Sequence, residues 1–115
     1  MARVFVLLAQ GGELDGVRIL SKDCIKTFTE PREGVRDLDK VILIPVWCGK
    51  AGYFLGGQPG ASSPLVLNHP DVLYSPGAGG SYAWADLRDN VSVAICHNNL
   101  DMGIIFEPEP MYGPI

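Results

Sequence analysis

The feature that most constrains the fold is a strict two-residue alternation in the segment from Ser81 to His97. In "SYAWADL" the aromatic residues fall on one face, and alanines and a leucine fall on the other. "RDN" then makes a turn, and "VSVAICHN" returns with the same alternation. Two such runs joined by a turn predict a β-hairpin over about residues 81–98. One face of this hairpin carries small residues, which suits a helix packed close against the sheet.

Two short helices are predicted before this hairpin. The first has apolar residues spaced for one face of a helix, which Gly11 and Gly12 would end. These apolar residues are Met1, Val4, Phe5 and Leu8. Ser21 is a suitable N-cap for the second helix, "KDCIKTFTE", which Pro31 stops.

The middle of the chain carries weaker strand signals. Asp15-Gly16 between apolar flanks indicates a tight turn. "VILIPVW" (residues 41–47) is predicted as an edge or bent strand because of Pro45, and "GYFLGG" as another short strand. The fold class expected is therefore α+β, an antiparallel sheet packed with short N-terminal helices. Residues 100–115 form a proline-rich tail that we expect to be irregular.

Charge and composition narrow the function classes. Thirteen acidic residues against nine basic ones leave a net charge of −4, which argues against a nucleic-acid surface. No apolar run is long enough to span a bilayer. "VFVLLA" lacks a following small-residue cleavage site, so the sequence leaves the compartment open and slightly favours the cytoplasm. The three cysteines have no C-x-x-C spacing and are expected to be buried, reduced thiols.

The glycine-rich segments do not match the nucleotide-binding motifs. Gly49-Lys50 is followed by alanine rather than by the Ser or Thr of a phosphate-binding loop. Gly77 and Gly79 begin a dinucleotide fingerprint, but Tyr82 occupies its last position. No cofactor is therefore expected.

Individual residues also suggest a serine hydrolase triad and a metal site. "GGSYA" is close to a nucleophile elbow, and Ser81, Asp86 and His97 follow the chain order of a hydrolase triad. The elbow requires a helix after the serine, whereas this sequence continues as a strand.

A metal site could be formed by three residues, but they lack ligand spacing, so no metal is expected. Those residues are His69, Cys96 and His97.

Taken in order, three segments resemble the C-terminal part of the serine β-lactamase-related family. They are "GGELDGVRILSKDCIKTFTEP", "GYFLGG", and "SPGAGGSYAWAD" followed by "VSVAICHN". That family includes class C β-lactamases, penicillin-binding-protein-like D,D-peptidases and related esterases. The resemblance covers residues 1–99 and implies part of a β-lactamase/transpeptidase-like fold. "PGAGGSYAWAD" is its most specific stretch.

The resemblance implies a substrate-binding and oxyanion wall at Ser75, Pro76, Gly77 and Ala78. Ser75-Pro76-Gly77 stands where the family has K-T-G or H-x-G. Ala78 stands where a backbone N–H helps to form the oxyanion hole. A side chain at Gly77 would obstruct the approach of substrate to this backbone.

The departures from the family pattern limit what this chain is expected to do alone. None of its serines has a lysine three residues on, and none of its tyrosines has an asparagine two residues on. The S-x-x-K nucleophile motif and the Y-x-N motif are therefore both missing, and Ser75 replaces the family's cationic or imidazole group. We expect no catalysis by the isolated chain, and a partner in the missing N-terminal part of the domain or in a second copy. The complete parent would hydrolyse ester, amide or lactam bonds through an acyl-serine. The alternatives are a non-catalytic binding module and a small esterase that uses Ser81.

Overall fold

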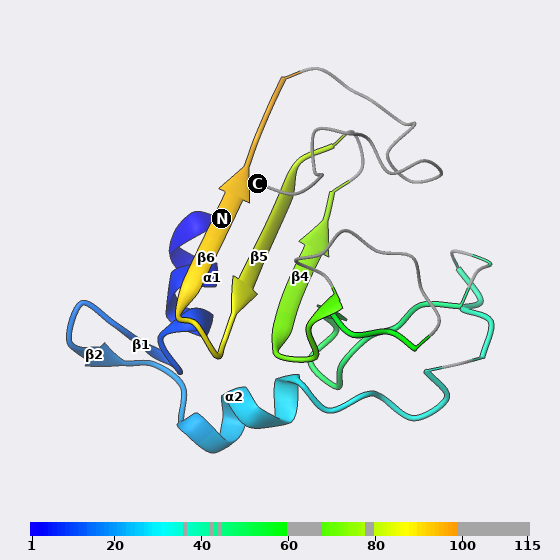
Figure 1. Ribbon diagram of the computed structural model, residues 1–115, viewed down its shortest axis with the longest axis horizontal. Coiled ribbons are helices and arrows are strands. Elements are labelled where there is room, and N and C mark those ends of the chain that lie inside the picture. Colours follow the sequence, from blue (N-terminus) through cyan, green and yellow to red (C-terminus); the bar gives the residue numbers. More distant parts are fainter. Residues whose placement is uncertain (36, 42, 44, 60–67, 78–79, 99–115) are drawn as a thin grey trace.

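Four antiparallel strands form the main sheet of the computed structural model, which describes residues 1–35, 37–41, 43, 45–59, 68–77 and 80–98 (Figure 1). They are β3 (Phe54–Leu55), β4 (Val72–Pro76), β5 (Tyr82–Asp86) and β6 (Val91–Ile95), and they lie in this order across the sheet. Every neighbouring pair is antiparallel. The α+β architecture expected from the sequence is confirmed.

The hairpin of β5 and β6 has the alternation predicted from the sequence. Ala83 lies opposite Ala94, and Trp84 lies opposite Val93. The side chain of Asp86 holds the turn, because its Oδ1 accepts hydrogen bonds from the backbone N–H groups of Arg88 (2.9 Å) and Asp89 (3.1 Å). An aspartate that caps its own following turn is a common local stabiliser.

Helix α1 (Ala2–Ala9) covers the small-residue face of this hairpin. Phe5 and Leu8 are buried in one cluster with Ala83 and Ala85, whose methyl groups let the helix approach the strands closely. Figure 1 shows α1 lying behind β6, on one face of the sheet. The predicted stripe is only partly buried, since Met1 and Val4 are half-exposed while Ala9 takes part in the core.

A small hairpin separates the two helices. β1 (Glu13–Leu14) pairs with β2 (Val17–Arg18) through the predicted Asp15-Gly16 turn. Both turn residues have positive φ, 51° and 78°, as a type I′ hairpin turn requires.

Helix α2 (Lys22–Phe28) begins where the sequence predicted. The Oγ of Ser21 accepts a hydrogen bond of 3.1 Å from the backbone N–H of Cys24. Ile25 is the buried residue of this helix and joins the α1 cluster.

Replacing Ser21 with alanine should lower the free energy of unfolding by about 1 kcal/mol, because one backbone N–H of the first turn loses its acceptor. Urea unfolding followed by circular dichroism measures this change. Ser21→Asp is the matched variant, which keeps a cap acceptor and should remain close to the parent. Equal losses for both variants would mean that the cap does not stabilise α2.

The strand predicted at residues 41–47 is wrong at Val41 and Leu43, whereas Pro45 forms an isolated β-bridge with Leu38. Positions 42 and 44 lie outside the described residues. Val41 is 88% exposed and Leu43 is 67% exposed, with a φ of 64° at Leu43. A local turn replaces the strand here, because Asp39 Oδ1 accepts from Val41 N (2.9 Å) and the Asp39 carbonyl accepts from Leu43 N (2.8 Å). Strand propensity thus yields to turn chemistry next to Pro45.

Hydrogen bonding to strand β3 begins just after this turn. The carbonyl of Trp47 accepts from Leu55 N (2.9 Å), and Gly49 N donates to the Tyr53 carbonyl (2.8 Å). Residues 47–49 therefore continue the main sheet beyond β3.

The cysteines are all free, but only one matches the expectation of burial. Cys48 is buried, Cys24 is half-buried and Cys96 is exposed. Burial raises the pKa of the Cys48 thiol. No helix in the described part of the chain is long and apolar enough to cross a membrane.

Candidate active-site wall

The predicted wall residues lie at the end of β4, a strand that no separate alternating pattern marks in the sequence. β3 pairs with β4 only through Phe54↔Tyr74 and Leu55↔Leu73. Ser75 and Pro76 are paired on the β5 side alone, with Ala83 and Tyr82. Among the described residues, the β3-side edge of β4 is therefore open from Ser75 onward.

A tight turn at Gly49–Gly52 precedes β3, whose pairing with β4 stops before Ser75. Gly52 N donates to the Gly49 carbonyl (2.9 Å), and Gly52 has a φ of 86°. The chain reverses here, so β3 begins at Phe54 and its pairing with β4 does not reach Ser75. Pro76 has no N–H, and a proline at an open edge discourages pairing with a further strand.

Gly77 leads the chain from β4 into the turn toward β5. Its N–H donates to the Ser81 carbonyl (2.7 Å), and its own carbonyl accepts from Gly80 N (3.1 Å). A Cβ built on Gly77 would lie 2.8 Å from the Ser81 carbonyl oxygen, closer than real Cβ contacts. The turn itself thus requires glycine, a reason additional to the substrate access inferred from the sequence.

The two faces of the wall differ in character. Ser75 lies on the face of β4 that also carries Leu73, which is the face covered by α1. The opposite face carries a row of rings, in which Tyr74 stacks on Tyr82 with centroids 5.7 Å apart. Burial raises the pKa of the Tyr74 hydroxyl.

Of the four predicted wall residues, the structure places Ser75, Pro76 and Gly77 side by side along this open edge. Ser75 is half-buried, and Pro76 and Gly77 are exposed. Ala78 lies outside the described residues.

The alternative triad is not assembled. Asp86 ends β5 five residues after Ser81, so the two lie about 16 Å apart at opposite ends of the strand. Asp86 is also engaged in the turn at its own end of the hairpin. His97 follows β6 at the same end as Ser81, and its buried Nε2 has no hydrogen-bond partner. A small esterase built on these three residues is therefore excluded by the register of the sheet.

The residues considered for a metal site are also separated. His69 lies before the start of β4, in contact with Arg88, whereas Cys96 and His97 follow the far end of β6. The described residues contain no group of three potential ligands.

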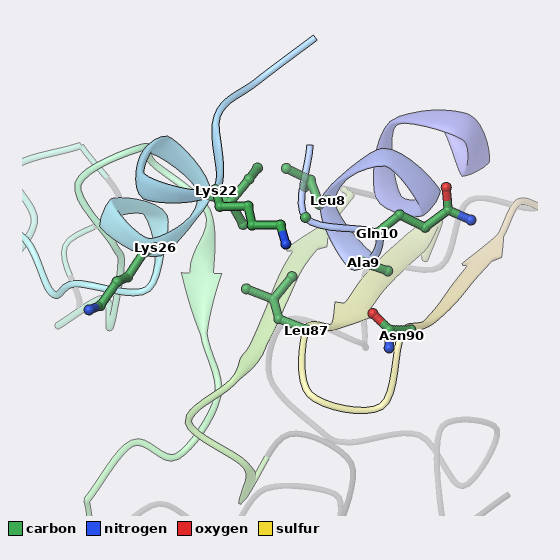
Figure 2. Close-up of a pocket in the computed structure, with 9 residues that line it drawn as sticks. Leu8, Ala9, Gln10, Lys22, Lys26, Leu87 and Asn90 are labelled. Atoms are coloured by element: carbon green, nitrogen blue, oxygen red, sulfur yellow. The ribbon is translucent and has the colours of Figure 1, made fainter. Parts of the chain in front are cut away.

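A cavity of about 300 Å³ lies at the other end of the sheet, where sequence reasoning predicted no site. It lies between the C-terminal end of α1, the helix α2 and the turn from β5 to β6, as Figure 2 shows. Its lining comes from three segments far apart in the sequence, so no local motif marks it. It is separated from Gly77 by the length of β5.

Comparison with known proteins defines the class. No protein-family model matches the chain. Over 102 residues, 87% of this chain, it is 32% identical to the esterase/beta-lactamase LipL of Mycobacterium tuberculosis.

Two solved structures share the fold. The crystal structure of a family VIII carboxylesterase matches 96% of the chain with a TM-score of 0.74 and 30% identity. A penicillin-binding protein homolog from Caulobacter crescentus matches 81% with a TM-score of 0.60 and 33% identity.

The matched class is that of esterases, β-lactamases and penicillin-binding proteins with an α+β fold. These similarities support a relationship of the chain to the serine β-lactamase-related family, over part of that family's domain. It spans 21% of the length of LipL and 28% and 23% of the two structures.

Proposed function

We propose that this chain supplies one wall of an ester-hydrolysing site whose nucleophile lies outside these 115 residues. The observation that supports this most is the edge of β4 at Ser75–Gly77, which no described residue pairs on the β3 side, within a chain 32% identical to an esterase/beta-lactamase. An open strand edge with no bulky side chain lets the carbonyl of a substrate reach the backbone.

Each wall residue has a separate task in this proposal. The N–H of Gly77 is occupied by the Ser81 carbonyl, so it cannot donate to a substrate. The next N–H, that of Ala78, is the proposed oxyanion donor. A donor fixed where negative charge develops stabilises the tetrahedral intermediate of acyl transfer. Ser75 offers a neutral hydroxyl where relatives place a cation or an imidazole, which favours ester substrates without a carboxylate.

The same proposal assigns the rest of the site to other residues. An acyl-enzyme requires a nucleophile activated by a neighbouring base. The sequence has neither S-x-x-K nor Y-x-N. The partner is therefore the remainder of a β-lactamase-like domain, which would pack beside the open edge.

A segment exchange tests this function. The matching segment of LipL is replaced by residues 1–99 of this chain, and hydrolysis of p-nitrophenyl butyrate is measured. We expect the chimera to hydrolyse the ester well above a matched chimera in which the nucleophilic serine is changed to alanine. The 115-residue chain alone should show no turnover.

The competing function is a binding module that keeps the wall without chemistry. The absence of both catalytic motifs is the observation that favours it. A folded chimera without ester hydrolysis, even after Ser75 is replaced by the LipL residue, would support the binding module and contradict the hydrolase wall.

A further inference from the structure

The cavity at the end of the sheet opposite the wall has features of a ligand site of its own. Its walls include the apolar side chains of Leu8, Ile25 and Leu87, which come from α1, from α2 and from the residue after β5. Ile25 is 5% exposed and Leu8 is 1% exposed, so this floor belongs to the packed core. The rim is polar and includes Gln10 and Asn90.

One cation reaches into this cavity. Figure 2 shows the amine of Lys22 directed into the space between Leu8 and Leu87. Lys26, one turn later on α2, directs its amine away from that space. No acidic residue is among the described residues that line the cavity.

In the described ranges, Lys22 takes part in none of the ion pairs. Glu13 is paired with Arg18 (3.0 Å), and Asp89 is paired with Arg88 (2.9 Å). Arg18 also donates to the Gly11 carbonyl (3.1 Å), which offsets the negative end of α1 beside the cavity.

The volume, the apolar lining and the amine of Lys22 together indicate the class of ligand. A volume of about 300 Å³ is at the lower end of small-molecule sites, which combine an apolar lining with a few polar groups. An apolar floor with one unpaired ammonium at its mouth is complementary to a small carboxylate with an aliphatic chain. We propose that this cavity binds short-chain monocarboxylates, with the carboxylate at Lys22 and the chain against the partly exposed side chain of Leu87.

This site is independent of the hydrolase proposal. It lies at the Asp86 end of β5, whereas Ser75–Gly77 lies near the Tyr82 end. Direct binding to the 115-residue chain tests it, so its failure leaves the hydrolase wall untouched, and the reverse also holds.

The experiment is a titration of the labelled 115-residue chain with sodium hexanoate, followed by NMR. We expect saturable shifts of the methyl groups of Leu8 and Leu87 and of the Lys22 side chain. Hexanol, which has the same chain but no charge, should bind more weakly by about threefold to fivefold, as expected for an exposed ion pair.

Two lysine variants complete the design. Lys22→Met keeps the length of the side chain and should weaken hexanoate to the affinity of hexanol, with hexanol itself unchanged. Lys26→Met, the matched control on the same helix, should leave both affinities unchanged. Equal binding of hexanoate to both variants, or shifts in the parent that avoid Leu8 and Leu87, would overturn the proposal.

Discussion

Replacing Leu73 with alanine should lower the free energy of unfolding by about 3 kcal/mol, one of the largest losses available in this chain. Leu73 is 0% exposed in β4, opposite Ala85 on one side and Leu55 on the other. Its side chain belongs to the cluster that holds α1 against the sheet. Truncation leaves a cavity that alanine neighbours cannot fill. Urea unfolding of the two proteins measures the difference.

Leu38→Ala is the matched control for this change. It removes the same atoms from a side chain that is 59% exposed, so we expect a loss below about 0.5 kcal/mol. Comparable losses for the two variants would show that Leu73 is not at the centre of the core.

The second large effect concerns activity. In the chimera with LipL, Gly77→Val should lower kcat for p-nitrophenyl butyrate by about a hundredfold, the loss expected when an oxyanion donor is displaced. A Cβ at this position meets the Ser81 carbonyl oxygen at 2.8 Å, so the turn must shift and carry the neighbouring N–H with it.

A glycine substitution away from the wall is the control that distinguishes a loss of activity from a loss of stability. Gly16→Ala strains a turn with a φ of 78° on the β1–β2 hairpin, where a Cβ meets nothing within 4 Å. It should cost about 1 kcal/mol of stability and leave kcat unchanged. If both variants lose activity in proportion to their thermal stability, Gly77 has no special role in the site.

The hairpin and the α1 packing could be predicted from the sequence because both depend on local periodicity. The alternation after Ser81 determines which side chains share a face, and the alanines on one face leave room for a helix. Ser21 and Asp15-Gly16 were predictable for a similar reason, since capping and turn chemistry involve residues close in sequence.

The other features of the fold and of the site depend on contacts that a local sequence pattern does not predict. Residues 41–47 have strong strand propensity, yet Asp39 forms a turn that leaves Val41 and Leu43 in solvent. The chain order Ser81, Asp86, His97 suggested a triad, but the strand separates the first two by its whole length. The pairing of β3 with β4 also stops before Ser75, and the turn at Gly49–Gly52 that precedes β3 lies more than twenty residues earlier in the chain.

We propose that the backbone N–H of Ala78 donates to the reacting carbonyl of an ester. A crystal structure of the chimera inhibited by an ester-mimicking alkylphosphonate tests it most directly. We predict a phosphonyl oxygen within about 3 Å of the Ala78 backbone nitrogen, the distance of an oxyanion-hole donor. A covalently bound phosphonate whose oxygens all lie beyond hydrogen-bond reach of Ala78 N would contradict the account.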